Sequence, residues 1–398
     1  MKPATNRGND LGGKVAIVGI GATEFSKDSG RSEMSLACEA TLAAIRDAGL
    51  APSDIDGMVT YTPENNPEVE IARHVGIGAL RHFSRVHYGG GAACGTVALA
   101  AMAVASGAAD AVVCYRAFNE RSGRRFGAGV QDIPNAATAE RAQFAYTTPF
   151  GQLTPASWVA MVAQRYMHDY GATSESFGHV AVAGRRHAAT NPAAWFYEQP
   201  ITMEDHQNSR WIVEPLHLLD CCQETDGAQA LVVVSAERAK DLPNRAAVVT
   251  ACAQGAGVEQ WTMTSFYRDD IAQLPEMKIV ADELWGSSGL TPSDIQTAIL
   301  YDHFTPYVLM QLEEFGFCGR GEAKDFVTDG RLEVGGALPT NTHGGQLGEA
   351  YIHGMNGIAE AVRQIRGTSV NQVGDVTNVL VTAGTGVPTS GLILSAPA

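Results

Sequence analysis

One short block occurs twice in this chain, far apart in the sequence. The segment Gly49-Leu-Ala-Pro-Ser-Asp-Ile55 recurs as Gly289-Leu-Thr-Pro-Ser-Asp-Ile295. In both copies the glycine suits the end of a helix, Pro-Ser-Asp favours a turn, and the isoleucine enters the next element. Each copy is expected to follow a helix and to lead into a strand that ends at a tyrosine, Tyr61 or Tyr301. The repeat predicts an internal duplication.

The order of the surrounding elements supports this prediction. A glycine-rich turn and helix at 89–106 corresponds to 344–364, and the apolar strand at 111–115 corresponds to 378–382. Short apolar runs of the buried-strand type alternate with segments of helical spacing along the chain. Such alternation is typical of an α/β fold in which helices cover a sheet.

The duplication divides the chain into two predicted domains. A chain of 398 residues is too long for one ordinary domain. We expect two similar halves, 14–240 and 245–398. The first half is longer, and its excess, about 117–223, contains many Pro, Gly and aromatic residues. This excess is expected to form a cap that helps to build the substrate cavity.

Composition excludes several classes of function. The net charge of −15 argues against a broad nucleic-acid interface. No apolar run reaches the roughly 18–20 residues that a membrane span needs, and the polar residues up to Gly13 lack an apolar signal core. The cysteine count of 7 is odd, and a chain of this length folds without disulfides. We therefore expect a cytoplasmic protein with reduced cysteines.

Four further segments form specific motifs when they are taken together. They are Pro149-Phe-Gly-Gln-Leu-Thr-Pro-Ala-Ser157, Cys222-Gln-Glu-Thr-Asp-Gly-Ala228, Tyr301-Asp-His-Phe-Thr305 and Asn341-Thr-His-Gly-Gly345. With the duplication, they resemble the thiolase superfamily, in particular its sterol carrier protein X and lipid-transfer protein branch. The resemblance covers nearly the whole chain. It implies a thiolase-like fold of duplicated α/β/α/β/α layers, with the cap inserted in the first half.

The chain departs from the thiolase pattern at the residues that carry thiolysis. The resemblance places Ala92 at the position of the nucleophilic cysteine and Val381 near the position of a second cysteine. Two family histidines correspond to Tyr301 and Tyr351. Thiolysis needs a thiolate to carry the acyl group, an acid–base thiol and donors for the oxyanion. The resemblance therefore argues against a thiolase, while the two tyrosines keep hydroxyls for proton transfer.

The same replacements resemble a subgroup, the steroid side-chain-cleaving aldolases. This resemblance implies retro-aldol cleavage of a 17-hydroxy steroid side-chain acyl-CoA to a 17-keto steroid and propionyl-CoA, without a covalent cysteine intermediate. CoA is then part of the substrate, and no cofactor is expected. No metal is expected either, because the histidine spacings form no recognised ligand set. The family implies a homodimer, and the subgroup a small acyl-CoA-associated partner protein with an OB-fold.

Tyr301 and Tyr351 are the expected acid–base pair, and either tyrosine suits either role. A free phenol has a pKa of about 10, so a base role needs a nearby cation or hydrogen-bond donor. The histidines near the motifs are the expected helpers, while Asp302 and Asn341 suit a structural role as well as a functional one. The supporting candidates are Asp302, His303, Asn341, His343 and His353.

The turn Gly89-Gly-Gly91 precedes a helix, so Gly91 and Ala92 are candidates to aim backbone amides at an enolate oxygen. A tight strand-to-helix turn is the other interpretation of these glycines. Two other functions stay open at this point. A shifted alignment would make Cys94 the nucleophile of a thiolase or acyltransferase, and a chain without catalysis would serve as an acyl-CoA or lipid-binding scaffold.

Overall fold

The computed structural model of this chain describes residues 11–62, 64–123, 125, 127, 144–261 and 265–397. Its centre is a nine-stranded mixed sheet with the strand order β3-β2-β4-β7-β1-β8-β11-β10-β9. Strand β2 is parallel to β3 and β4, β9 is parallel to β10, and the other pairs are antiparallel. The strands are β1 (Val15–Ala22), β2 (Gly57–Tyr61), β3 (His82–Val86), β4 (Ala111–Asn119), β7 (Asp226–Ser235), β8 (Ala247–Gly255), β9 (Thr297–Ile299), β10 (Asn378–Ala383) and β11 (Thr389–Ser395).

The strands follow a corresponding order on both sides of the middle of the sheet, except that β3 adds one strand at one edge. Strands β1 and β8 meet there, through Ala16 opposite Val248 and Ile17 opposite Ala247. Outward from this junction run β7, β4 and β2 on one side and β11, β10 and β9 on the other. The two copies of the repeated block form short 3-10 helices, Pro52–Asp54 and Pro292–Asp294, which precede β2 and β9. The proposed domain limits, 14–240 and 245–398, stay predictions.

One predicted element boundary was wrong. The strand expected to end at Tyr301 is β9, and it ends at Ile299. Beyond this end, the Tyr301 N–H donates to Thr382 Oγ1 and not to the backbone of β10, while the Leu300 backbone is bonded by Asn341. Its Oδ1 accepts from the Leu300 N–H at 2.8 Å, and its Nδ2 donates to the Leu300 carbonyl at 2.9 Å.

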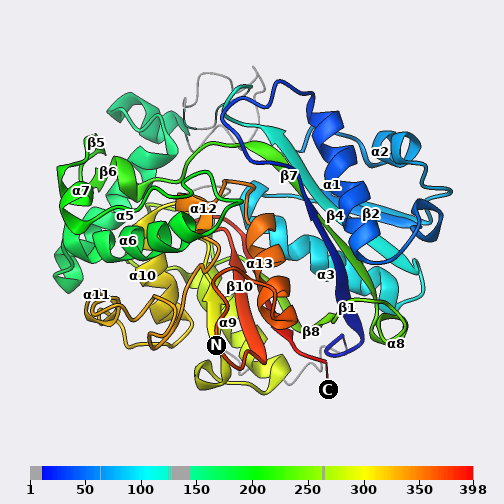
Figure 1. Cartoon of the computed structure of the whole chain (residues 1–398). Helices are drawn as coiled ribbons and strands as arrows, with labels where there is room; N and C mark the ends of the chain where they lie inside the picture. Colours follow the sequence, from blue (N-terminus) through cyan, green and yellow to red (C-terminus); the bar gives the residue numbers. More distant parts are fainter. Residues whose placement is uncertain are drawn as a thin grey trace.

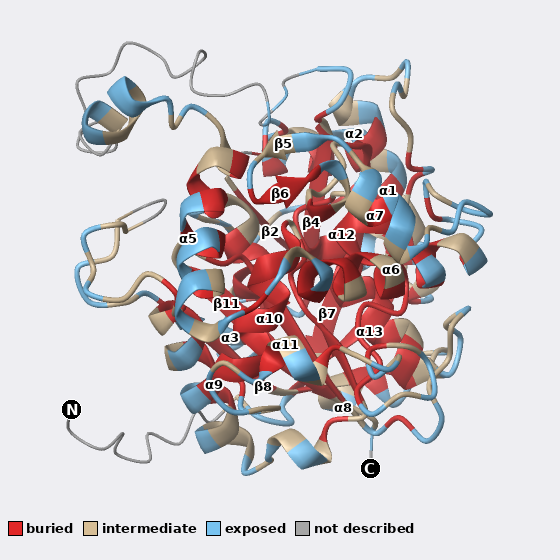
Figure 2. Cartoon of the chain, turned by 90° about the vertical axis from the view of Figure 1, so that its left-hand side faces the viewer, coloured by how far each residue is buried: buried red, intermediate tan, exposed pale blue. Residues whose placement is uncertain are grey.

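Helices and sheet form the predicted layers (Figure 1). Strand side chains alternate between faces, so Val15 and Ile17 pack into the central layer while Ala16 and Val18 pack against an outer helix. The central layer contains α3 (Ala93–Ala105) and α13 (Met355–Arg366). The outer layers contain α1 (Glu33–Asp47) and α2 (Glu68–Val75) on one side, and α9 (Pro275–Ser288) and α10 (Thr305–Glu314) on the other. Figure 2 shows the sheet and the central helices as the buried part of the molecule.

The cap packs on α10 through an apolar cluster that it shares with α9. It contains α5 (Pro155–Tyr170), α6 (Ser174–Thr190), α7 (Met203–Asn208) and the hairpin β5 (Trp211–Val213) and β6 (Leu216–His217). The predicted start of the cap at 117 lies inside β4, because β4 pairs with β7 as far as Asn119. Residues 128–143 of the predicted cap lie outside the described residues.

The remaining helices are single turns: α8 (Ala236–Ala239), α11 (Ala323–Phe326) and α12 (Gly345–Gly348). None of the helices in the described ranges is long and apolar enough to span a membrane.

Candidate active site

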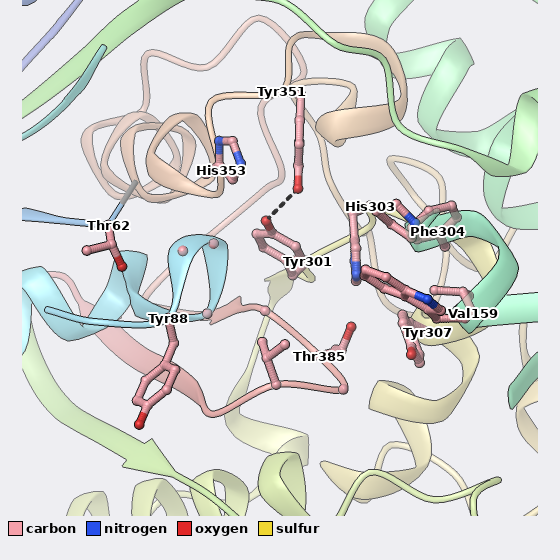
Figure 3. A pocket seen from close by; sticks show the side chains of 18 of the residues that line it. Thr62, Tyr88, Val159, Tyr301, His303, Phe304, Tyr307, Tyr351, His353 and Thr385 are labelled. Carbon is pink, nitrogen blue, oxygen red and sulfur yellow. Dashed lines mark hydrogen bonds between the residues drawn. The ribbon is translucent and has the colours of Figure 1, made fainter. Parts of the chain in front are cut away.

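A cavity of about 380 Å³ lies at the start of α3 (Figure 3). Its wall is built by the turn before α3, by α5, by the segments after β9 and before α13, and by the turn between β10 and β11. Large apolar side chains dominate this wall, which suits an apolar ligand. They include Tyr88, Trp158, Val159, Phe304, Tyr307 and Val387.

Tyr301 and Tyr351 meet at this wall, with their hydroxyl oxygens 3.2 Å apart. The Tyr301 backbone is anchored on both sides, because its N–H donates to Thr382 Oγ1 at 2.9 Å and its carbonyl accepts from Gln311 Nε2 at 2.9 Å. The Tyr351 N–H donates to Thr225 Oγ1 at 3.2 Å. The two hydroxyls are therefore held within hydrogen-bonding distance, so one proton can pass between them.

The surroundings keep both phenols protonated. Burial raises the pKa of Tyr301 well above its ordinary value, and the hydrogen bond from Tyr351 only partly opposes this shift. Burial also raises the pKa of Tyr351 well above its ordinary value, and the neighbouring Tyr301 raises this pKa further. A lasting phenolate is therefore disfavoured near neutral pH. A neutral pair can still accept a proton at one hydroxyl and release one at the other.

Two of the predicted helper histidines, His303 and His353, reach the same cavity. Burial lowers the pKa of His303 to about 3. Burial, and then the positive charge of Arg116, lowers the pKa of His353 well below its ordinary value. Both imidazoles are therefore neutral near pH 7. A cationic helper role is therefore disfavoured for these two residues, and the role of hydrogen-bond donor remains.

His353 is fixed from behind the cavity wall. Its backbone adopts a left-handed φ of 49°, and its carbonyl accepts a hydrogen bond of 3.0 Å from Tyr61 Oη. Its Nδ1 lies 3.4 Å from Arg116 Nη2 and 3.8 Å from Glu120 Oε2. The ring itself lies beside Tyr351, with 4.4 Å between the ring centroids. The Nδ1 atom of this imidazole therefore contacts charged groups of the protein and not the cavity.

The structure does not bring Asp302, Asn341 or His343 to the described wall of the cavity. Asp302 is buried, and its Oδ1 accepts from the Gln346 N–H at 2.8 Å. Asn341 bonds the Leu300 backbone, as described above. His343 Nε2 lies 3.8 Å from Glu349 Oε2 in a buried polar cluster. Their contacts are those of residues that support the segments carrying the tyrosines.

Comparison with known families assigns the fold. The model for "Thiolase, N-terminal domain" matches residues 15–237, and the model for "Thiolase C-terminal domain-like" matches residues 257–395. The chain belongs to the thiolase family. The resemblance stated from the sequence motifs is thereby confirmed, and so is the thiolase-like α/β fold.

Some thiolase-family relatives are much more similar to the chain than a shared fold requires. The "Steroid side-chain-cleaving aldolase" of Thermomonospora curvata is 70% identical over 97% of this chain and 99% of its own length. The "17-hydroxy-3-oxo-4-pregnene-20-carboxyl-CoA lyase" of Mycobacterium tuberculosis is 65% identical over 96% of this chain and 100% of its own. A solved structure described as "Ltp2-ChsH2(DUF35) aldolase" superposes with a TM-score of 0.93 at 70% identity, covering 97% of this chain and 98% of that one.

The described wall of this thiolase-family cavity includes no cysteine. Cys94 is buried beneath the wall, and its thiol donates to the Val381 carbonyl at 3.8 Å. Burial raises the pKa of the Cys94 thiol above its usual range. A nucleophilic cysteine needs a lowered pKa and access to the substrate. Cys94 has neither property, which disfavours the shifted-nucleophile alternative for this member of the thiolase family.

Gly91 and Ala92, the predicted amide donors of the thiolase-type turn, lie in a 3-10 helix over Gly89–Ala92. The Gly91 N–H donates to the Tyr88 carbonyl at 3.1 Å, and the Ala93 N–H donates to the Gly90 carbonyl. Gly91 lines the cavity, whereas Ala92 lines a neighbouring cavity of about 270 Å³ instead. The backbone N–H groups of Gly91 and Ala93 are thus already hydrogen-bonded inside the turn.

Sequence reasoning missed Glu120, which lies behind His353. Both carboxyl oxygens are buried and hydrogen bond to no residue in the described part of the chain. Burial raises the pKa of Glu120 well above its ordinary value. No sequence signal could have found it, because Glu120 follows β4 outside any motif of the thiolase family.

Proposed function

We propose that this chain cleaves a 17-hydroxy steroid side-chain acyl-CoA by a retro-aldol reaction, releasing a 17-keto steroid and propionyl-CoA. The observation that carries this proposal is the hydrogen bond between Tyr301 and Tyr351 in an apolar cavity whose described wall has no cysteine. The names of the two relatives at 70% and 65% identity support the same reaction class.

The reaction needs one proton to move from oxygen to carbon. One tyrosine of the pair accepts the proton of the 17-hydroxyl group and passes its own proton across the 3.2 Å hydrogen bond. The C17–C20 bond breaks, its electron pair moves into the thioester as an enolate, and a carbonyl forms at C17. The second tyrosine then protonates C20, which completes propionyl-CoA. Atoms and electrons balance without an acyl-enzyme, and the reaction as written consumes no cofactor.

This proposal predicts the products of a single assay. The purified chain, alone and with its partner protein, is incubated with the 17-hydroxy steroid acyl-CoA, and both products are followed by chromatography and mass spectrometry. Equal amounts of 17-keto steroid and propionyl-CoA are expected, at a rate independent of added thiol. The matched substrate without the 17-hydroxyl group should not react. Acyl transfer to free CoA from a 3-ketoacyl-CoA would instead show thiolysis and contradict the proposal.

We also propose that the chain forms a homodimer through strand β3. This strand ends the sheet on one side, and Phe83 on it is 60% exposed. An open strand edge presents unpaired backbone groups that can join a second copy. Light scattering of the purified chain should give twice the mass of 42.1 kDa. A monomer at micromolar concentration would contradict this assembly.

A partner protein and a cytoplasmic location complete the proposal. The solved relative is named "Ltp2-ChsH2(DUF35) aldolase", and this name supports a small partner protein for the present chain. The family resemblance implies that this partner has an OB-fold. Co-expression with such a partner should yield a co-purifying complex and a higher cleavage rate. All 7 cysteines are free thiols, as expected for a protein of a reducing compartment.

A further inference from the structure

The proposed reaction creates an enolate oxygen that needs a hydrogen-bond donor. Such donors contribute most when they are fixed in a dry site before the charge develops. In the turn before α3, the Gly91 and Ala93 amides already donate to carbonyls of the same turn. The Nδ1 side of His353 faces Arg116 and Glu120. The other predicted helper at the described wall is His303.

His303 is a fixed polar group at the described cavity wall without a described hydrogen-bond partner. Its ring stacks on that of Tyr307, with ring centroids 5.2 Å apart and an interplanar angle of 21°. It also makes an edge contact with the ring of Tyr301, with 4.9 Å between the centroids. Its backbone carbonyl accepts from the Cys222 N–H at 2.8 Å. These contacts hold the ring beside the tyrosine pair (Figure 3).

The two ring nitrogens of His303 differ in their surroundings. Nδ1 is buried and has no hydrogen-bond partner among the described residues. The residue is partly exposed and lines the cavity, so its ring reaches the cavity through the other edge, which carries Nε2. A buried N–H without an acceptor is costly. The favoured tautomer therefore carries its proton on Nε2, where a ligand oxygen can accept it.

We propose that His303 is a catalytic residue that donates its Nε2–H to the thioester oxygen of the substrate and stabilises the enolate formed there. The role rests on the proposed retro-aldol function. Because the enolate oxygen and C20 are separated by only one carbon atom, the donor must lie next to the tyrosine pair, and the ring of His303 lies beside that of Tyr301. The pKa of His303, lowered by burial to about 3, keeps the imidazole neutral, so it donates a hydrogen bond without losing a proton.

Thr385 is the rival donor. Its hydroxyl is buried without a described partner, and the residue lines the same cavity. Figure 3 shows Thr385 on the turn beyond Tyr301, whereas His303 lies on the segment that carries Tyr301 itself. Substitution of each residue in turn separates the two possibilities. Thr385→Val removes only the hydroxyl and keeps the shape of the side chain.

The test combines cleavage kinetics with the infrared spectrum of bound propionyl-CoA labelled with ¹³C at the thioester carbonyl. In the wild-type chain this carbonyl band should move to lower wavenumber on binding, because a hydrogen bond weakens the C=O bond. In His303→Phe the shift should disappear, and kcat should fall about 100- to 1000-fold, the loss typical of a missing oxyanion donor. In His303→Gln, whose amide still donates, most of the shift and of kcat should return.

Each outcome decides the role of His303. A bound carbonyl band in His303→Phe that equals the wild-type band would overturn the proposal, as would loss of the shift in Thr385→Val with no loss in His303→Phe. If Gln and Phe variants fold normally and lose kcat equally, His303 acts only through packing. If the wild-type chain cleaves no steroid thioester but the band still depends on His303, the proposed function fails while the donor contact stands.

Discussion

Gly90 lies directly under the phenol of Tyr301. A Cβ atom on residue 90 would meet the Tyr301 hydroxyl oxygen at 1.9 Å, far inside van der Waals contact. Gly354, with a left-handed φ of 88°, approaches the same ring from another side, where a Cβ would lie 3.2 Å from Cε2. The Tyr301 hydroxyl can therefore occupy its position only because residues 90 and 354 are glycines.

The first prediction follows from this contact. Gly90→Ala should displace the Tyr301 hydroxyl from Tyr351 and lower kcat/KM for cleavage about 100-fold, since a misplacement of about 1 Å can cost that much. Gly78→Ala is the matched control, because a Cβ at this exposed glycine meets nothing within 4 Å. Steady-state kinetics and circular dichroism of both variants check the prediction. An unchanged rate in Gly90→Ala would show that Tyr301 does not need its observed position.

The second prediction concerns the tyrosine pair as a unit. Tyr301→Phe and Tyr351→Phe should each lower kcat about 100- to 10,000-fold, the usual range for loss of an acid–base group. The double variant should be little slower than the single ones, because each change alone interrupts proton transfer between the hydroxyls. Single-turnover rates measure these effects. Losses that multiply in the double variant would mean that the two tyrosines act independently.

The third prediction concerns pH. Burial raises the pKa of both phenols well above their ordinary values, so the protonated pair persists at alkaline pH. If a neutral pair transfers the proton, kcat should stay nearly constant from about pH 7 to pH 9. If a free phenolate were the base, kcat would rise about tenfold per pH unit over this range. The pH profile of kcat distinguishes these two mechanisms.

The fourth prediction concerns Cys94. Because its thiol is buried and burial raises its pKa, Cys94→Ala should keep kcat within a few-fold of wild type. Iodoacetamide should not label Cys94 in the folded chain, which peptide mass spectrometry can establish. Substrate-protected alkylation of Cys94 with loss of activity would instead support thiolase chemistry.

The fifth prediction assigns a structural role to Asn341. Its side chain closes two hydrogen bonds with the Leu300 backbone, next to Tyr301, and its own φ is 52°. Asn341→Gly tolerates this φ but leaves the buried Leu300 N–H without its partner, so it should lower the free energy of unfolding by about 1–3 kcal/mol. Asn341→Ala should cost about 1 kcal/mol more because of backbone strain. Chemical denaturation compares the variants, and equal stability of Gly and Ala would remove the strain argument.

The repeated block and the motif positions predicted the layered α/β fold, because such patterns are local in sequence. The motif positions also singled out Tyr301 and Tyr351, whose hydroxyls lie 3.2 Å apart, and their catalytic role stays a prediction. The end of β9 could not be predicted in this way. Beyond Ile299 the backbone of Leu300 and Tyr301 bonds the side chains of Asn341 and Thr382, which are distant in sequence. Gly90 and Glu120 could not be predicted either, because they contact Tyr301 and His353, which are distant from them in sequence. The neutral state of His303 likewise follows from burial, which no motif records.

Helices α3 and α13 both begin beside the proposed reacting groups, one just after the turn that contains Gly90 and the other just after His353, and both then run through the central layer. Tight packing transmits small shifts along such helices. The alignment of the two proposed catalytic tyrosines therefore depends on how α3 and α13 pack in the central layer. Directed evolution toward bulkier or smaller substrates should consequently select substitutions along α3 and α13, away from the residues that contact the substrate.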